Sequence, residues 1–441
     1  MKNWKRMLAG VCAATMIVSG MTITAAADGT SLVFCDTMSS PEREALFADL
    51  FARYEEQTGV SVEYTTIPYE EAENKLVAMA ATESLPDVIA TGSMAVLAHM
   101  DALEPLTEYW ANYEYLDEVM PATQTFVEEL GTLNGEIYCI PDSFILRGVF
   151  VRTDWMEEAG LNVADYEDQM SWEDYFNIIE AINDPENGRY GIAFRGGQMN
   201  MMAPGEYLQS VMGWNYQMLS DEQSIYGTEE AIEYIGRYLD LYKNGYAPEE
   251  AINWGYPEMV EGFVSGQCGT LVQTPEVVPV CEESMEPGTW TVLPWPTQEG
   301  LDKDVMCWGS STAYVMSAFC ENKDAAWDLL AWLSSPEINL EYCKEFGAIP
   351  INQSALEDPY FAEGVSKGYV TRLLSENFTT AISVTEIPDM NTFNDLVMAE
   401  NQKYLLGEQD LATSLKNMDD WLVGRIAEIR AEQATETEAA E

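Results

Sequence analysis

Aromatic rings and carboxylates are the side chains of this sequence that offer the most chemistry. Its 441 residues include 12 Trp, 23 Tyr and 75 Asp or Glu. Flat rings bind the apolar C–H faces of a sugar, and carboxylates accept hydrogen bonds from the hydroxyls around it. The composition therefore favours a neutral sugar as a ligand, while most of the aromatic side chains are expected to pack in the core.

Residues for covalent or metal chemistry are scarce. His99 is the single histidine, which excludes a His-rich metal cage and paired-histidine chemistry. The sequence has no G-x-x-x-x-G-K-[ST] phosphate loop and no C-x-x-C pair, and no G-x-S-x-G elbow accompanies His99. With 75 acids, close carboxylate pairs arise by chance and say nothing about catalysis. We expect no catalytic residue, no metal and no cofactor.

The charge balance limits the partners. Lys and Arg number 21, so the formal net charge is −54 at pH 7. Phosphate contacts require Lys and Arg, and an anionic membrane surface repels such a chain. A nucleic-acid partner is therefore not expected.

The first 27 residues have the features of a leader. Three basic residues precede an apolar stretch at 7–24, and the small residues 25–27 form a cleavage site. The alternative is a membrane anchor, but Gly and Ser interrupt the stretch. Cys12 lies inside this stretch after Val11, so a lipid anchor is not supported. We expect a signal peptide and an extracellular or cell-envelope protein.

Strand and helix signals alternate from residue 32 onward. Strands are predicted at 32–35, 60–64 and 88–90, separated by helices that begin at Ser40-Pro41 and cover about 70–81. This order predicts an α/β fold with a parallel sheet, whose ligands bind at the carboxyl ends of the strands. These ends carry Asp36, Thr37, Tyr69, Thr91, Ser93 and Met94.

A second α/β unit is predicted to begin near residue 140. Strands are expected at 149–151, 191–194 and 308–316, and Ser171 with Asp174 predicts a helix N-terminus. Another helix is expected at 325–333, and a solvated tail from about residue 433. Several candidate ligand-binding residues lie near its loops or strand ends: Trp214, Trp254, Tyr256, Trp308 and Ser310.

Several stretches, in this order, carry a resemblance to a known family. They include FADLFARYEEQTGVSVEY, NGEIYCIPDSFILRGVFVRTDWMEEAGL, SWEDYFNIIEAIND, EMVEGFVSGQCGTLVQTPE and KDAAWDLLAWLSSPEINLEYCKEFGAIPINQSA. The sequence resembles the extracellular solute-binding proteins of ATP-binding-cassette (ABC) sugar importers, the maltose-binding-like group.

This resemblance implies a two-lobed fold like that of periplasmic binding proteins, with a hinge and a ligand cleft between the lobes. Lobe 1 would hold 28–141 and 300–349, and lobe 2 would hold 142–299 and 350–435, followed by an acidic tail at 436–441. Relatives in single-membrane bacteria usually carry a lipid-modified cysteine, and this sequence has no convincing one, so the resemblance does not predict how the protein is retained at the cell surface.

The resemblance also assigns binding positions. In relatives the strand ends of lobe 1 approach the sugar, and a polar pair stands where Asp142 and Ser143 lie here. Gln273 and Glu276 fall where relatives have an Asn and a stacking aromatic, so Glu276 replaces a ring.

Arg195 stands apart from the other candidates. An arginine facing the cleft would favour a carboxylated or phosphorylated sugar, and the alternative is a surface ion pair in an acid-rich protein.

Together, these observations predict an exported protein without enzymatic activity. It would capture a mono- or oligosaccharide and deliver it, as a monomer, to the membrane permease subunits of an ABC importer. One alternative keeps the fold and binds a polyamine or another small solute through ion pairs and cation–π contacts. The other is a secreted glycosidase.

Overall fold

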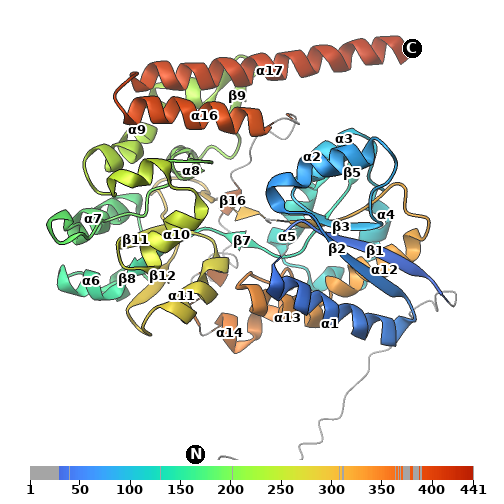
Figure 1. Ribbon diagram of the computed structural model, residues 1–441. Helices are drawn as coiled ribbons and strands as arrows, with labels where there is room; N and C mark the ends of the chain where they lie inside the picture. The colour runs from blue at the N-terminus through green and yellow to red at the C-terminus, as the bar shows by residue number, and fades with distance from the viewer. Residues whose placement is uncertain are drawn as a thin grey trace, which may run out of the picture.

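The computed structural model describes residues 29–38, 40–129, 131–200, 202–306, 308–309, 312–362, 364–365, 367, 369–370, 378–380, 387 and 390–440. The predicted signal peptide lies outside this range. Two lobes stand side by side in Figure 1, lobe 1 on the right and lobe 2 on the left.

Lobe 1 is built on a five-stranded sheet with the order β2-β1-β3-β15-β6. The predicted parallel arrangement of the first three strands is confirmed, since β1 pairs in parallel with both β2 and β3. The later strand β15 returns antiparallel to β3 and pairs on its other side with β6. The strands are β1 (Ser31–Asp36), β2 (Ser61–Thr66), β3 (Val88–Thr91), β6 (Ile140–Pro141) and β15 (Ala313–Met316), with a small hairpin of β4 (Thr132–Leu133) and β5 (Glu136–Ile137).

Helices cover this sheet because each has one apolar face. In α1 (Pro41–Thr58), Phe47, Leu50 and Phe51 are buried against the strands. The predicted N-terminus of α1 is confirmed, since the Ser40 hydroxyl accepts the Arg43 amide, and Gly59 ends the helix in the left-handed conformation. The other helices of lobe 1 are α2 (Tyr69–Ala80), α3 (Met94–His99), α4 (Thr107–Ala111), α5 (Pro121–Glu129), α12 (Lys323–Leu333) and α13 (Pro336–Phe346).

Lobe 2 is built on a three-stranded antiparallel sheet with the order β11-β8-β12. The predicted start of α7 is confirmed, because Ser171 and Asp174 form a reciprocal capping box. The elements are β8 (Gly148–Arg152), α6 (Thr153–Glu158), α7 (Trp172–Ile182), α8 (Met202–Met212), β9 (Met218–Ser220), β10 (Gln223–Ser224), α9 (Glu229–Lys243), α10 (Tyr256–Val264), β11 (Thr270–Gln273), α11 (Val278–Ser284) and β12 (Trp290–Leu293). Short 3-10 turns complete the chain at η1 (Leu116–Glu118), η2 (Val163–Asp165), η3 (Pro185–Asn187), η4 (Ile225–Gly227), η5 (Glu249–Asn253), η6 (Pro275–Val277) and η7 (Ser354–Glu357).

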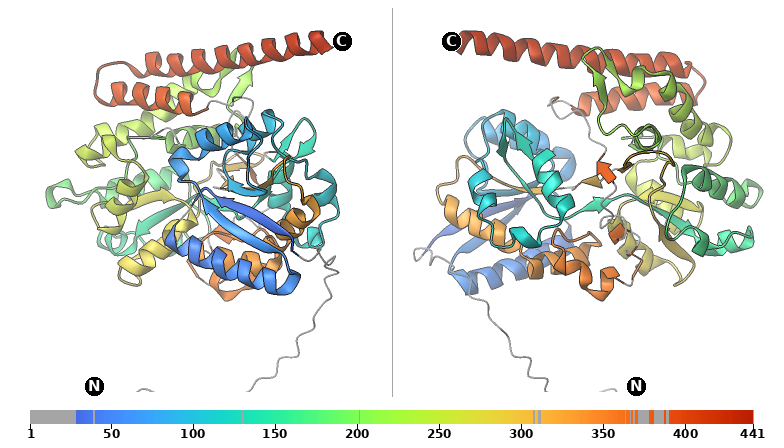
Figure 2. Two further views of the ribbon diagram at one scale, coloured as in Figure 1. Left: turned by 45° about the vertical axis from the view of Figure 1, so that its right-hand side comes forward. Right: turned by 180° about the vertical axis from the view of Figure 1, so that it is seen from behind.

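Two long helices close the chain. Figure 2 shows α16 (Met390–Leu405) and α17 (Leu411–Ala440) lying side by side at the top of lobe 2. The helix α17 runs through the residues predicted as a solvated tail, since Ala and Glu favour helix. Within the described residues, no helix is long and apolar enough to cross a membrane.

The chain crosses between the lobes along paired strands. On the way from β6 to β8 it forms β7 (Ile145–Leu146), and on the way back from β12 to β15 it forms β14 (Trp308–Gly309). These two strands pair antiparallel with each other, and β13 (Asp304–Met306) pairs in parallel with β16 (Phe378–Thr380). After α14 (Pro359–Ala362), Tyr369 packs so closely on Gly148 that a side chain there would meet its ring at 2.7 Å.

Two strand predictions are corrected by this arrangement. The strand predicted at 308–316 is two strands, because β14 pairs with β7 in the crossing while β15 pairs with β3 in lobe 1. Residues 191–194 form no strand. The amide of Ala193 donates to Thr270 of β11, whereas the amide of Ile192 donates to Tyr246 outside the sheet.

Candidate functional site

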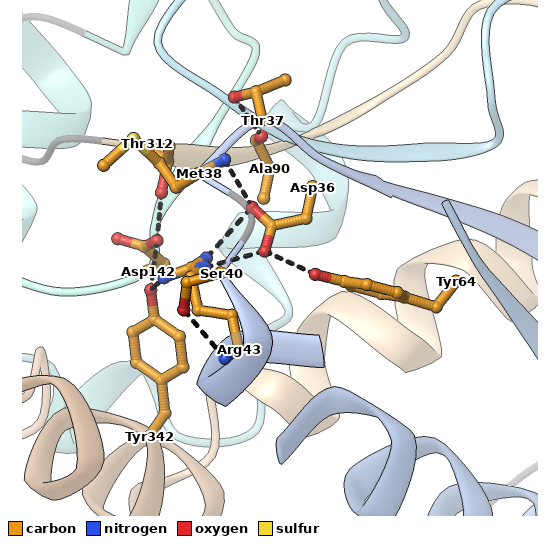
Figure 3. Close-up of polar contacts among 10 residues, drawn as sticks. All are labelled: Asp36, Thr37, Met38, Ser40, Arg43, Tyr64, Ala90, Asp142, Thr312 and Tyr342. Carbon is orange, nitrogen blue, oxygen red and sulfur yellow. Dashed lines mark hydrogen bonds and ion pairs between the residues drawn. The ribbon is translucent and has the colours of Figure 1, made fainter. Parts of the chain in front are cut away.

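A buried ion pair fixes the end of β1. The Arg43 guanidinium donates to both oxygens of Asp36, at 2.7 Å from Nε and 3.2 Å from Nη2. Tyr64 donates its hydroxyl to the same carboxylate at 2.9 Å, and so does the Met38 amide. Asp36 is fully buried. Figure 3 shows these donors converging on it from α1, β2 and the chain after β1.

The same arginine reaches a second carboxylate through a tyrosine. Arg43 Nη1 donates to the Tyr342 hydroxyl at 2.7 Å, and this hydroxyl donates to Asp142 Oδ2 at 2.9 Å. Burial raises the pKa of Tyr342 well above its ordinary value, so the phenol keeps the proton that it donates. Thr312 and Ser143 also donate to Asp142 (Figure 3 shows the Thr312 contact).

These contacts place three sequence-predicted residues in one buried network. Asp36, Asp142 and Ser143 are all less than 5 % exposed. The network ties β1, α1 and α13 to the segment where the chain leaves lobe 1 for β7. Its clear physical role is to hold that segment. Contact of these residues with a ligand stays a prediction.

The other predicted strand ends of lobe 1 differ in exposure. Thr37 is buried and donates to Ala90 O at 2.8 Å, and the buried Thr91 hydroxyl accepts the Ser93 amide at 3.1 Å. Ser93 and Met94, at the start of α3, are half-buried. Tyr69, the first residue of α2, is 58 % exposed and is the predicted residue of lobe 1 that offers the most surface.

A second buried ion pair lies in lobe 2. Arg147, between β7 and β8, contacts Glu206 of α8 at 2.7 Å and donates to the Gln273 side chain at 3.3 Å. Arg147 is 6 % exposed, and Gln273 is buried at the end of β11. Gln273 is thereby oriented, because its side-chain oxygen also accepts from the Thr274 amide and hydroxyl.

The loop that carries Arg195 is fixed by close backbone packing. The amides of Gly196 and Gly197 each donate at 2.9 Å, to Ala251 O and Trp254 O. A Cβ on Gly196 would lie 2.5 Å from Ile252. This approach requires glycine, and it explains the Gly-Gly pair structurally. Arg195 Nε donates to Gln198 O at 2.8 Å, which shapes the loop further.

Residues from both lobes meet around Arg195. Its charge interacts with Arg147 and Tyr256 of lobe 2 and with Tyr69 of lobe 1. Tyr256 in turn interacts electrostatically with Glu276. Arg195 and Gln273 line one pocket of lobe 2, and Tyr69, Tyr256 and Glu276 are linked to this region by electrostatic interactions. A direct contact also joins the lobes nearby, from Asn391 of α16 to Glu73 of α2 at 3.2 Å.

The predicted tryptophans are placed differently. Trp254 is 8 % exposed and packs on Gly262 inside lobe 2, where a side chain would meet its ring at 2.7 Å. Trp214 follows α8 and is half-buried. The backbone of Trp308 pairs with Leu146 in the crossing strands. Ser310 lies outside the described residues, so its contact with a ligand stays a prediction.

Sequence reasoning missed Arg147 and its partner Glu206. A charged residue in the otherwise apolar run ILRGVFV was the available signal, because an arginine in a buried strand needs an anionic partner. Its partner lies 59 positions away on α8 and had no comparable signal.

A sequence profile of bacterial extracellular solute-binding proteins matches residues 49–366. The chain belongs to this family. Among its relatives, the putative ABC transporter periplasmic-binding protein YcjN of Escherichia coli is 22 % identical over 58 % of each chain. The mannitol-binding protein of Pseudomonas aeruginosa is 26 % identical over 53 % of this chain and 52 % of its own. The chain thus spans only part of the length of these two relatives.

Solved structures of the family share the two-lobed fold. A solute-binding protein from Thermotoga lettingae, solved with α-D-tagatose, covers 90 % of this chain and 99 % of its own, with a TM-score of 0.73 and 20 % identity. At this identity the likeness establishes the fold. In the described residues of the present family member, no group of three or more His, Cys, Asp or Glu could hold a metal ion.

The buried network of Arg43 generates a stability prediction. Arg43→Met leaves two buried carboxylates without their cation, and should lower the free energy of unfolding by about 3–5 kcal/mol. The matched control is Arg53→Met on the same helix, whose half-exposed pair with Glu341 of α13 should contribute about 1 kcal/mol or less. Urea unfolding of both variants measures this. Equal losses would show that the network does not carry the stability assigned to it.

Glu276 generates a pH prediction. Burial raises the pKa of its carboxyl above the ordinary value of 4.5, although Thr274 and Arg147 oppose the shift. Above that value the unfolded chain loses this proton first, so the folded state binds more protons and stability falls as pH rises. Glu276→Gln removes this loss, and the stability of the variant relative to the parent should increase as pH rises above the ordinary value of 4.5.

The control for this experiment is Glu283→Gln, an exposed carboxyl on the neighbouring helix α11. Urea unfolding at a series of pH values should show no pH-dependent gain for this control. A Glu276→Gln curve parallel to that of the parent would contradict the assigned pKa direction.

Proposed function

We propose that this protein captures a carbohydrate between its two lobes and delivers it to the membrane permease subunits of an ABC importer. The observation that carries the proposal is that Arg195 of lobe 2 interacts electrostatically with Tyr69 of lobe 1 as well as with Tyr256 of lobe 2. A solute bound there would contact both lobes at once. It would therefore stabilise the closed arrangement relative to an open one.

The side chains at this place suit a sugar. Tyr69 and Tyr256 offer ring faces for C–H surfaces, and both retain exposed surface, 58 % and 36 %. Gln273 and the guanidinium of Arg195 offer polar groups for hydroxyls. Relatives solved or named with tagatose and mannitol support this class of ligand.

A polyamine fits less well. It would need several carboxylates facing the ligand, and two of the three predicted ones, Asp36 and Asp142, are engaged by Arg43 and Tyr342, which leaves Glu276 alone. Arg147 and Arg195 would instead repel a cation. These two carboxylates do not support glycosidase activity either, since both are buried in the network.

Ligand screening by thermal shift tests the proposal. Sugars, sugar alcohols, oligosaccharides, sugar acids and polyamines are offered to the full exported chain. A ligand at about 100 times its dissociation constant should stabilise the fold by about 2.7 kcal/mol. We expect a carbohydrate to do so and to be recovered intact by chromatography. Stabilisation by polyamines alone, or steady shortening of the sugar, would contradict the proposal.

Tyr69→Ala is the informative variant for the same screen. The ring is exposed, so its loss should leave the melting temperature unchanged while weakening sugar binding by roughly tenfold, about 1.4 kcal/mol. Leu406→Ala is the control, because this residue, directly after α16, is exposed to a similar degree, 61 %.

A further inference from the structure

Two arginines line one pocket in the wall of lobe 2. Its polar lining comprises Arg147, Arg195, Asn200, Tyr238 and Gln273, and the rest of the lining is apolar. Among these described residues the lining contains two guanidiniums and no carboxylate. Glu206 pairs with Arg147 at 2.7 Å from outside this lining, so Arg195 supplies most of the positive charge that the pocket presents in a chain of formal net charge −54.

Contacts within the protein hold both arginines in place before a ligand binds. Arg147 is held by Glu206 and Gln273, and Arg195 stands on the loop fixed by Gly196 and Gly197. Asn200, which also lines the pocket, donates to Gly196 O at 3.1 Å. A ligand that binds here therefore orders few side chains, which lowers the entropic cost of binding.

The surroundings of Arg195 disfavour additional positive charge. Burial and the neighbouring charge of Arg147 lower the pKa of Arg195 to about 10, although Glu206, Tyr256 and Tyr69 oppose the shift. The guanidinium stays charged at neutral pH, in surroundings that disfavour further positive charge. Glu206, the carboxylate that interacts with Arg195, is already paired with Arg147 at 2.7 Å.

We propose that Arg195, supported by Arg147, forms a subsite for the carboxylate of a sugar acid. A carboxylate accepts two parallel hydrogen bonds from a guanidinium, which gives orientation as well as affinity. The sugar ring would then lie toward Tyr69 and Tyr256, which both interact with Arg195. This inference rests on the proposed function and narrows its ligand from a neutral sugar, which the composition favoured, to a uronate.

Paired ligands test the subsite. Isothermal titration at neutral pH compares D-glucuronate with D-glucose, and D-galacturonate with D-galactose, so that each pair differs in the carboxylate. We expect at least one acid to bind at least tenfold more tightly than its neutral partner. Inorganic phosphate alone is the competitor that distinguishes a carboxylate subsite from a general anion site, and it should not displace the acid at equal concentration.

Variants assign the effect to Arg195. Arg195→Gln should weaken binding of the uronate at least tenfold and binding of the neutral sugar less than threefold. Arg195→Lys should recover only part of the lost affinity, because lysine lacks the planar guanidinium that donates two parallel hydrogen bonds. Arg189→Gln is the matched control, since this residue of the same lobe forms an exposed pair with Glu158. Arg189→Gln should leave the affinity for both ligands unchanged.

The outcomes separate the two proposals. Tight binding of neutral sugars with no preference for either acid overturns the carboxylate subsite and leaves the proposed function intact. Displacement of the acid by phosphate at equal concentration also overturns the carboxylate subsite. Failure of all four ligands in these titrations, together with failure of every carbohydrate in the thermal-shift screen, contradicts the proposed function itself.

Discussion

Arg43 holds two buried carboxylates together in a protein with a large negative charge. It pairs with Asp36 at the end of β1 and, through Tyr342, with Asp142 at the point where the chain leaves lobe 1. Two buried carboxylates so close together would repel each other without this cation. The position of the crossing strands, and hence the approach of the two lobes, depends on this network.

The network also determines what remains available to a ligand. Because Asp36 and Asp142 are engaged within the protein, the candidate site depends on other side chains. Arg147 and Arg195 of lobe 2 line a common pocket, and Tyr69 of lobe 1 interacts electrostatically with Arg195. Negative charge is abundant over the whole chain, whereas two arginines line this pocket. This arrangement is consistent with selection of a polar, anionic or hydroxylated solute.

Local signals in the sequence predicted much of the fold. The Ser40 and Ser171 helix starts and the parallel strands β1 to β3 follow from spacing and capping within a few residues. The prediction of a single strand at 308–316 was wrong, because this segment forms two strands that pair with two distant partners, β7 and β3. At the site, residue types suggested Tyr69, Arg195 and Tyr256, but Arg147 was missed because its partner Glu206 is remote in sequence. The engagement of Asp142 by Tyr342, 200 positions away, was equally inaccessible.

A crystal structure of the full exported chain grown with the most stabilising carbohydrate tests the central claim most directly. The account predicts electron density for an intact sugar between the lobes, in contact with Tyr69 of lobe 1 and with Arg195 of lobe 2, and an undisturbed Arg43 network. A sugar that contacts one lobe alone, that binds away from these two residues, or that is found cleaved would contradict it.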